Sequence, residues 1–324
     1  MNIRGWALGV MAGACLLACR RTSEPPSGAG DVAPGEDVGE RALAEVARFL
    51  RLGPRVAGTP GAAAAADYLA QRLADLGVPV EVDKFRDMSP FGEMVFRNVV
   101  GRLAGTEPGV IVLAAHYDTK AGIADAFQGA NDSGSGVGLL LELARRLQET
   151  PRNGPAVWFV FLDGEECRVR YGPHDGLHGS RRMAAQLAAG VEHHPVRAVV
   201  VVDMIGDRDL RVTIPRNVSP ELLQMVLEAA RAEGVRAAFG LHAGAILDDH
   251  QPFLDAGFPA VLLIDFEYGP VPGSNAYWHT MDDTLDKLSA ESLETVGRVV
   301  LRFLHMLGGR GTTGPPTRNR SPFR

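Results

Sequence analysis

The sequence has few cysteines and no surplus of positive charge. It contains three cysteines in 324 residues, and two of them, Cys15 and Cys19, lie near the N-terminus, which leaves Cys167 alone in the rest of the chain. No disulfide framework is therefore expected in the folded part. The chain has 33 basic and 39 acidic residues and a net charge of −6, so it lacks the basic footprint of nucleic-acid-binding proteins. No nucleic-acid partner is expected.

Long apolar runs and phosphate-binding loops are missing as well. Outside the N-terminus, no apolar run reaches the roughly 18 residues that a membrane-spanning helix needs. The glycine-rich segment 129–138 has neither the Gly-x-Gly-x-x-Gly order of a dinucleotide site nor the Gly-Lys-Ser/Thr of a nucleotide loop. Hydrophobic residues at 46% and charged residues at 22% are ordinary for a globular protein, whose length allows one large α/β domain or two smaller ones.

The N-terminal segment is typical of an export signal. An arginine at position 4 precedes the apolar stretch 6–18, and the tetrapeptide Leu-Leu-Ala-Cys that ends at Cys19 resembles a bacterial lipobox. We therefore predict that residues 1–18 are removed and that a lipid on Cys19 is the protein's only membrane anchor. The expected location is the cell envelope, in the periplasm or at the outer surface. The alternative is an ordinary signal peptide that happens to contain cysteines.

Composition divides the rest of the chain into three parts. Residues 19–39 are rich in proline, glycine, serine and acidic residues, which predicts a flexible linker. The tail 308–324 contains four arginines and no acidic residue, and we expect it to be disordered. Residues 40–307 are expected to form the catalytic domain. Apolar periodicity predicts helices over residues 42–52, 62–76 and 289–307 of this domain.

Residues 157–166 combine an apolar strand with a cluster of carboxylates. The run Val157–Leu162 is too short for a helix and rich in β-formers, so it predicts a buried strand. Asp163, Glu165 and Glu166 follow it directly, at the carboxyl end of the strand, where open α/β sheets bind their ligands. Two adjacent glutamates in such a place repel each other unless a cation is bound. The segment therefore indicates a metal site.

Three further predicted strands also end on polar residues. The apolar segment 110–115 precedes His116 and Asp118, which project to the same side because they are two residues apart. The aspartate can then accept the N–H of the imidazole and orient its other nitrogen. Two more apolar segments end on Asp203 and Asp265. Since the carboxyl ends of parallel strands lie at one edge of a sheet, these side chains are expected to converge.

Two loops add further donor groups. Asn131 and Asp132 precede the apolar helix 139–147, where Asp132 can either cap the helix or bind a cation. His279 follows Trp278 in the loop after the last predicted strand. Histidine nitrogens and carboxylate oxygens together are the ligands expected for zinc. Six residues thus predict a zinc site: His116, Asp132, Glu165, Glu166, Asp203 and His279.

In chain order, these polar segments resemble the motifs of the zinc aminopeptidase family, which also contains the animal-type glutaminyl cyclases. The resemblance extends over residues 41–307 and implies a three-layer α/β/α fold with a mixed, mainly parallel central sheet. The motifs are His116-x-Asp118, Asn131-Asp132-Ser133, Asp163-Gly164-Glu165-Glu166, Asp203-Met204-Ile205-Gly206 and Trp278-His279-Thr280.

The resemblance also implies roles for individual residues. Asp132, Glu166 and His279 match the ligands of one zinc. His116 and Asp203 match the positions that bind a second zinc in two-metal aminopeptidases. The general acid/base falls on Glu165.

Three segments favour the cyclase branch over a plain aminopeptidase. The loop 167–180 is longer than in typical aminopeptidases, although Tyr171 stands where cyclases commonly have a tryptophan. The segment 247–254 is similar to a cyclase segment whose first aspartate, here Asp248, takes part in catalysis; a helix cap is its alternative role. Trp278 directly precedes His279, as in the wall of the cyclase pocket.

The cyclase branch implies conversion of the N-terminal glutamine of a peptide or protein to pyroglutamate, with loss of ammonia and one zinc ion. Catalytic roles would fall on Glu165, Asp203 and Asp248. Substrate contacts would fall on Trp278, Tyr171 and His116. The alternatives are an aminopeptidase with one or two zinc ions and an inactive binding module at the cell surface. The insert 265–276 is expected to form part of the pocket rim, and Cys167 to pack in the interior.

Overall fold

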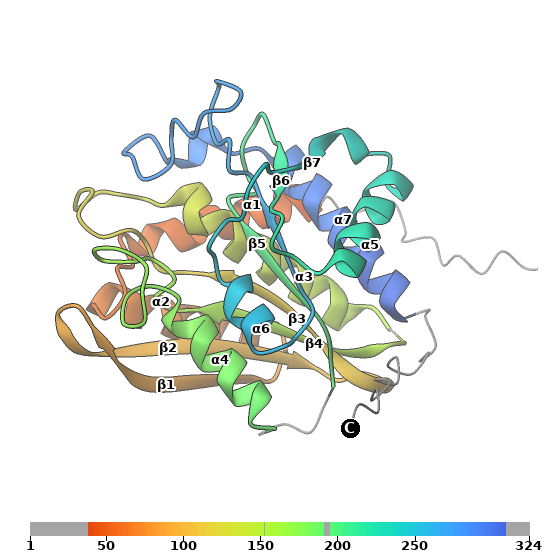
Figure 1. The fold of residues 1–324 in the computed structure, drawn as a ribbon, viewed down its shortest axis with the longest axis horizontal. Helices are drawn as coiled ribbons and strands as arrows, with labels where there is room; N and C mark the ends of the chain where they lie inside the picture. The colour runs from red at the N-terminus through yellow and green to blue at the C-terminus, as the bar shows by residue number, and fades with distance from the viewer. Residues whose placement is uncertain (1–37, 152, 191–194, 309–324) are drawn as a thin grey trace, which may run out of the picture. The chain divides into compact units, whose positions relative to one another are not determined.

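Six strands form the central sheet of the computed structural model, which describes residues 38–151, 153–190 and 195–308 (Figure 1). The strand order is β1-β2-β4-β3-β5-β8. The last four strands in this order pair in parallel, and β1 and β2 add an antiparallel hairpin beside β4. The strands are β1 (Val80–Ser89), β2 (Gly92–Leu103), β3 (Glu107–His116), β4 (Pro155–Leu162), β5 (Val196–Asp203) and β8 (Ala260–Ile264).

Helices cover both faces of this sheet, which explains why its parallel strands are nearly continuous apolar runs. On one face α1, α3 and α7 pack against one another, α2 packs on β2, and α5 packs on α7. On the other face α4 contacts α6, and Figure 1 shows both in front of the strands. The helices are α1 (Val38–Phe49), α2 (Pro60–Asp75), α3 (Gly136–Glu149), α4 (His178–Ala188), α5 (Pro220–Ala232), α6 (His250–Asp255) and α7 (Ala290–Gly308).

Shorter elements complete the described part of the chain. β6 (Val212–Ile214) and β7 (Phe239–Leu241) form a second, two-stranded parallel sheet. The 3-10 turns are Leu50–Leu52, Arg236–Ala238 and Leu285–Lys287, and a π-type turn spans Ala130–Ser135. The three-layer α/β/α architecture with a mixed, mainly parallel sheet, expected from the sequence, is thereby confirmed.

The N-terminal boundary of the folded domain differs slightly from the prediction. α1 begins at Val38, and both Val38 and Gly39 are buried, so these two residues belong to the domain and not to the linker. At the other end α7 includes Gly308, which the prediction placed in the tail. The predicted signal peptide, the remainder of the linker and residues 309–324 of the tail lie outside the described residues. Within the described ranges, no helix is long and apolar enough to cross a membrane.

The carboxyl ends of the parallel strands meet at one edge of the sheet. His116 is the last residue of β3 and Asp203 the last of β5. Asp163 directly follows β4, and Asp265 directly follows β8. Since β3 pairs with both β4 and β5, the polar residues that follow these three strands are neighbours in space.

Candidate metal centre and catalytic pocket

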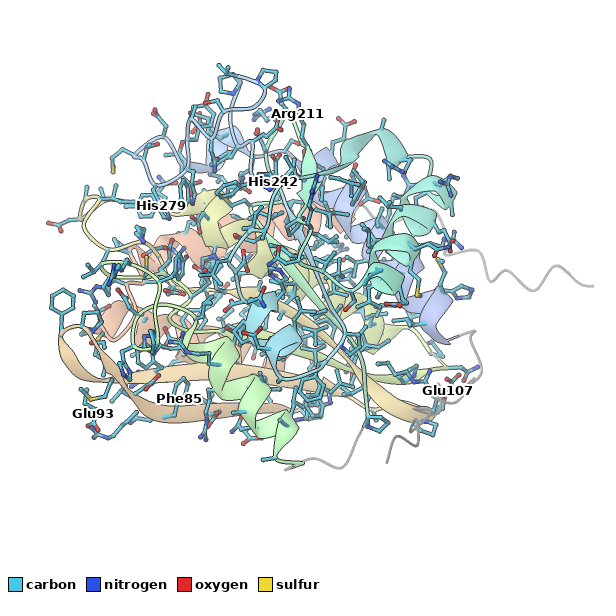
Figure 2. All side chains as sticks on the ribbon, viewed as in Figure 1. Phe85, Glu93, Glu107, Arg211, His242 and His279 are labelled. Atoms are coloured by element: carbon cyan, nitrogen blue, oxygen red, sulfur yellow. The ribbon has the colours of Figure 1, made fainter. Side chains whose placement is uncertain are left out.

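Asp132 links two histidines that are far apart in the sequence. Its Oδ1 lies 3.1 Å from Nε2 of His116, and its Oδ2 lies 3.3 Å from Nε2 of His279. Glu166 Oε1 is 2.9 Å from the same nitrogen of His279, and Asp203 Oδ1 is 3.3 Å from Nε2 of His116. The structure thus brings together the five residues to which the family resemblance assigns metal positions; Figure 2 labels His279 of this group.

The five residues form two overlapping groups, each with possible metal-binding atoms within 4.8 Å of one another. One group is Asp132, Glu166 and His279; the other is His116, Asp132 and Asp203. Imidazole nitrogens and carboxylate oxygens are the donors that zinc accepts. Three buried carboxylates at such short range also need a compensating positive charge. The donor set therefore fits zinc, with positions for one ion or two.

The electrostatics of these groups are those of a cation site. Burial opposes the charge of His279, but hydrogen bonds with Asp132 and Glu166 raise its pKa to about 9. Burial likewise opposes ionisation of Asp132, but its two histidine partners lower its pKa. Metal binding would displace the imidazole protons, so the affinity for a metal is expected to fall as the pH falls.

Asp118 positions three of the site residues through hydrogen bonds to its carboxylate. The backbone N–H groups of Glu165 and Glu166 donate to its two carboxylate oxygens at 3.1 and 3.2 Å. Its Oδ1 also lies 3.4 Å from Nδ1 of His116, as the His-x-Asp spacing indicated. One fully buried carboxylate thereby fixes the segment after β4 to the end of β3.

Asp283 has the equivalent role for Asp132 and is not among the predicted residues. Its carboxylate accepts the backbone N–H groups of Asn131 at 2.7 Å and Asp132 at 3.2 Å, together with the hydroxyl of Tyr268 at 2.9 Å. Burial, followed by the charge of Asp132, raises the pKa of Asp283 to about 7. The residue before α3 is Ser135, so the helix-cap alternative for Asp132 is wrong.

Arg55 is a second residue that was not predicted. Its side chain is completely buried and donates from Nε to the Tyr117 carbonyl at 2.9 Å and from Nη1 to the Gln128 carbonyl at 3.0 Å. Nη2 donates to the Gly129 carbonyl at 3.1 Å. The guanidinium therefore ties the segment that follows His116 to the turn that carries Asp132. The only sequence signal is a lone arginine inside a Gly- and Pro-rich loop.

Lys120 adds a positive charge beside the glutamate pair. Its Nζ lies 3.2 Å from Glu166 Oε2 and donates to the Cys167 carbonyl at 2.7 Å. The same amine is 3.3 Å from Cys167 Sγ. Cys167 is buried, as its predicted packing role requires, and the amine beside it was not foreseen. Lys120 neutralises the Glu166 oxygen that faces away from His279.

A pocket of about 280 Å³ opens over the first metal group. Trp278 stacks on the His279 ring with 4.0 Å between centroids and meets Phe266 edge-on at 5.3 Å. Phe266 belongs to the insert expected at the rim. His116 is not among the lining residues, so the structure places it behind the pocket. The lining consists of Asp132, Glu165, Glu166, Tyr171, Asp203, Met204, His242, Ala245, Ile246, Leu247, Asp248, Ile264, Phe266, Trp278 and His279.

Three carboxyl groups that do not belong to the first metal group share this pocket, those of Glu165, Asp203 and Asp248. Burial, followed by the charge of Glu166, raises the pKa of Glu165 well above its ordinary range. Burial, followed by the charge of Asp203, does the same for Asp248. The helix-cap alternative for Asp248 does not fit, because the residue that directly precedes α6 is Asp249, whose side chain makes no cap bond either. The pocket therefore holds carboxyl groups that bind a proton more tightly than exposed carboxylates do, which suits a site that accepts and returns protons.

The loop 167–180 folds back over Glu165. The Asp175 carboxylate accepts three successive backbone N–H groups, those of residues 168 to 170, at 2.6 to 2.9 Å. The hydroxyl of Tyr171 then reaches Glu165 Oε1 at 2.8 Å. Gly176 makes room for this ring, because a Cβ there would lie 2.5 Å from Tyr171 Cδ1.

The fold and the histidine–carboxylate cluster at the carboxyl edge of its sheet define an enzyme of the zinc exopeptidase class. The chain belongs to Peptidase family M28, whose sequence profile matches residues 98–304. It is 30% identical to the glutaminyl-peptide cyclotransferase of Bos taurus, over 78% of this chain and 79% of that protein.

Solved structures show the same relationship. A glutaminyl cyclase from an Acidobacteriales bacterium is similar with a TM-score of 0.81 and 35% identity, covering 89% of this chain and all (100%) of that one. A Zn-dependent exopeptidase from Parabacteroides distasonis is similar with a TM-score of 0.74 and 26% identity, covering 86% and 100%. The family and the donor set both indicate zinc as the metal.

Proposed function

We propose that this chain is a zinc-dependent glutaminyl-peptide cyclotransferase, which converts the N-terminal glutamine of peptides or proteins to pyroglutamate and releases ammonia. The observation that carries the proposal is the shared pocket of Glu165, Asp203 and Asp248, walled by Trp278. Three carboxyl groups around a small pocket suit a reaction that moves protons between two nitrogens. The cyclotransferase of Bos taurus and the bacterial glutaminyl cyclase support the same reaction.

The protein residues would move protons within this pocket. Glu165 takes a proton from the substrate α-amine as the bond between that nitrogen and the carbonyl carbon of the glutamine side-chain amide (Cδ) forms. It returns the proton to the amide nitrogen as the old carbon–nitrogen bond breaks and ammonia leaves. Asp203 and Asp248, both buried, share a proton and orient the leaving nitrogen. A zinc ion held by Asp132, Glu166 and His279 would supply Lewis-acid polarisation of the γ-carbonyl.

A zinc aminopeptidase is the second candidate. The observation that favours it is the second ligand group of His116, Asp132 and Asp203, which offers a place for another ion. In that reaction Glu165 would deprotonate a water molecule for attack on the peptide bond. We propose one zinc for the cyclase, with His116 and Asp203 left for hydrogen bonding.

The location is a proposal that rests on sequence. We propose an exported lipoprotein, anchored to the cell envelope by a lipid on Cys19; the support is the Leu-Leu-Ala-Cys pattern, which lies outside the described residues. Mass spectrometry of the mature N-terminus tests it. An unacylated N-terminus, or one upstream of Cys19, would contradict it.

The reaction is tested by following the mass of two substrates. The purified protein is incubated with a glutamine-initiated peptide and, separately, with leucine amide. Loss of ammonia from the peptide, with the chain otherwise intact, supports the cyclase. Release of a free amino acid from either substrate supports the aminopeptidase instead. The matched variant Glu165→Gln should keep its zinc and lose about 10²- to 10⁴-fold in kcat.

A further inference from the structure

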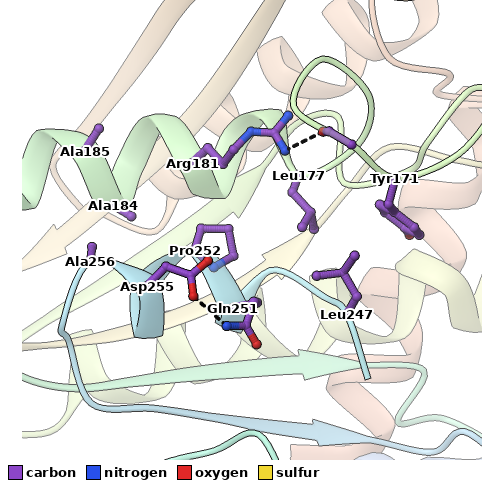
Figure 3. Close-up of a pocket in the computed structure, with 11 residues that line it drawn as sticks. Tyr171, Leu177, Arg181, Ala184, Ala185, Leu247, Gln251, Pro252, Asp255 and Ala256 are labelled. Atoms are coloured by element: carbon purple, nitrogen blue, oxygen red, sulfur yellow. Dashed lines mark hydrogen bonds between the residues drawn. The ribbon is translucent and has the colours of Figure 1, made fainter. Parts of the chain in front are cut away.

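A second cavity lies next to the catalytic pocket, between α4 and α6 (Figure 3). We call it the α4–α6 groove. Its volume is about 550 Å³, within the usual range for binding sites of small ligands. Tyr171 and Leu247 line both the groove and the catalytic pocket, so the two cavities meet at these side chains.

The two helices present small apolar residues to the groove, beside the polar side chains of Arg181, Gln251 and Asp255. Ala184 and Ala185 of α4 face Pro252 and Ala256 of the α6 segment, with Leu177 between the two ends. Figure 3 shows Tyr171 and Leu247 at one end and Ala185 and Ala256 at the other. The groove therefore leads away from the catalytic pocket along the two helices. Alanine side chains leave space for the main chain of a bound peptide.

Arg181 has a hydrogen-bond donor that no other residue in the described part of the chain uses. Its Nη1 donates to the Gly172 carbonyl at 3.1 Å. Its Nη2 is buried, and among the described residues it has no hydrogen-bond partner. A buried N–H without an acceptor is unfavourable, and buried donors are normally paired. Arg181 lines the groove, so an acceptor oxygen of a molecule bound there can satisfy this donor once the side chain rotates toward it.

We propose that the α4–α6 groove binds the residues that follow the N-terminal glutamine of the substrate. Their apolar side chains pack between the two helices, and a carbonyl oxygen accepts the free N–H of Arg181. The inference rests on the proposed function, because a peptide whose first residue occupies the catalytic pocket can continue past Tyr171 and Leu247 into the groove. It makes the enzyme selective for peptides with apolar residues after the glutamine.

The test compares a substrate that reaches the groove with one that does not. The two are the peptide Gln-Leu-Ala-Leu amide and glutamine amide, and the quantity is the ratio of their kcat/KM values, measured by ammonia release. Ala185→Trp fills the groove from its exposed side and should lower this ratio about tenfold, mainly through the KM of the peptide. Ala232→Trp, on an exposed position of α5 away from the groove, should not change it.

A binding measurement removes the dependence on turnover. The product pyroglutamyl-Leu-Ala-Leu, labelled at its C-terminus, should bind Ala185→Trp about tenfold more weakly than wild type in fluorescence anisotropy. If the ratio and the Kd are unchanged while ammonia is still released from both substrates, peptide binding in the α4–α6 groove is contradicted. The proposed function would not be affected by that result. No ammonia from either substrate with the wild-type protein would overturn both.

Discussion

The hydroxyl of Tyr171 donates a 2.8 Å hydrogen bond to Oε1 of Glu165. Tyr171 belongs to the loop 167–180, whose length favoured the cyclase branch, and Glu165 follows β4. Burial and the charge of Glu166 raise the pKa of Glu165. A hydrogen bond donated to the carboxylate acts in the opposite direction, because it stabilises the ionised form. The loop therefore helps to set the basicity of the proposed general base.

Replacement of Tyr171 by phenylalanine should move the pH dependence of the reaction. Without the hydroxyl, the ionised form of Glu165 is less stable, so its pKa rises further and less of the base is ionised at a given pH. The acidic limb of the pH profile of kcat/KM should shift to higher pH by about one unit. The measurement is the rate of ammonia release between pH 5 and 9.

The control is Tyr68→Phe, because the Tyr68 hydroxyl is buried in α2 without a partner among the described residues. This variant should keep the wild-type profile. A Tyr171→Phe enzyme with lower kcat but an unshifted acidic limb would show that the hydroxyl positions substrate and does not tune Glu165.

Asp118→Asn should weaken zinc binding about 10- to 100-fold, since groups that orient metal ligands contribute to this extent. The carboxylate of Asp118 accepts the backbone N–H groups of both Glu165 and Glu166, and an amide group can accept only one of them. Competition with a chromophoric chelator measures the affinity. Asp286→Asn, at an exposed position, is the control and should bind zinc like wild type. Equal affinities in both variants would contradict the role of Asp118.

The sequence predicted the strand ends, and the convergence of the candidate ligands that follow them, because this pattern is local. An apolar run followed by His116, Glu166 or Asp203 marks both the strand and the edge where the side chain projects. Arg55 and Asp283 could not be predicted in this way. Each acts on backbone groups that only the folded chain brings near, and their own neighbours in sequence show no periodic pattern.

Arg55→Met should cost about 3–5 kcal/mol of stability. The apolar side chain would fill the space beside Phe49, whose ring lies 4.5 Å from the guanidinium carbon. It would leave the carbonyls of Tyr117 and Gln128 without the donor that Arg55 provides. Urea unfolding followed by circular dichroism gives the free energy. Arg51→Met, at an exposed position four residues earlier in the chain, should change it by less than about 0.5 kcal/mol. Similar losses in both variants would argue against a specific role for the buried guanidinium.

Asp163 should make the protein less stable as the pH rises. Its Oδ2 accepts the Arg97 backbone N–H at 2.8 Å, but its Oδ1 is buried without a partner among the described residues. Burial, followed by the charge of Asp118, raises the pKa of Asp163 from the ordinary 3.8 to about 8. Between these values the folded state keeps a proton that the unfolded state has released. Stability that is fully present below pH 3.8 is therefore lost as the pH rises toward 8.

Asp163→Asn removes this titration and can still accept the Arg97 N–H through its carbonyl oxygen. Relative to wild type, the variant should gain stability from pH 5 to pH 8, by up to about 1.4 kcal/mol for each pH unit. Urea unfolding at pH 5, 6.5 and 8 measures the difference, with Asp67→Asn on the exposed side of α2 as the control. Parallel stability curves for wild type and Asp163→Asn would mean that Asp163 is ionised in the folded protein. Its unpaired Oδ1 would then need a positive partner or a water molecule in the interior.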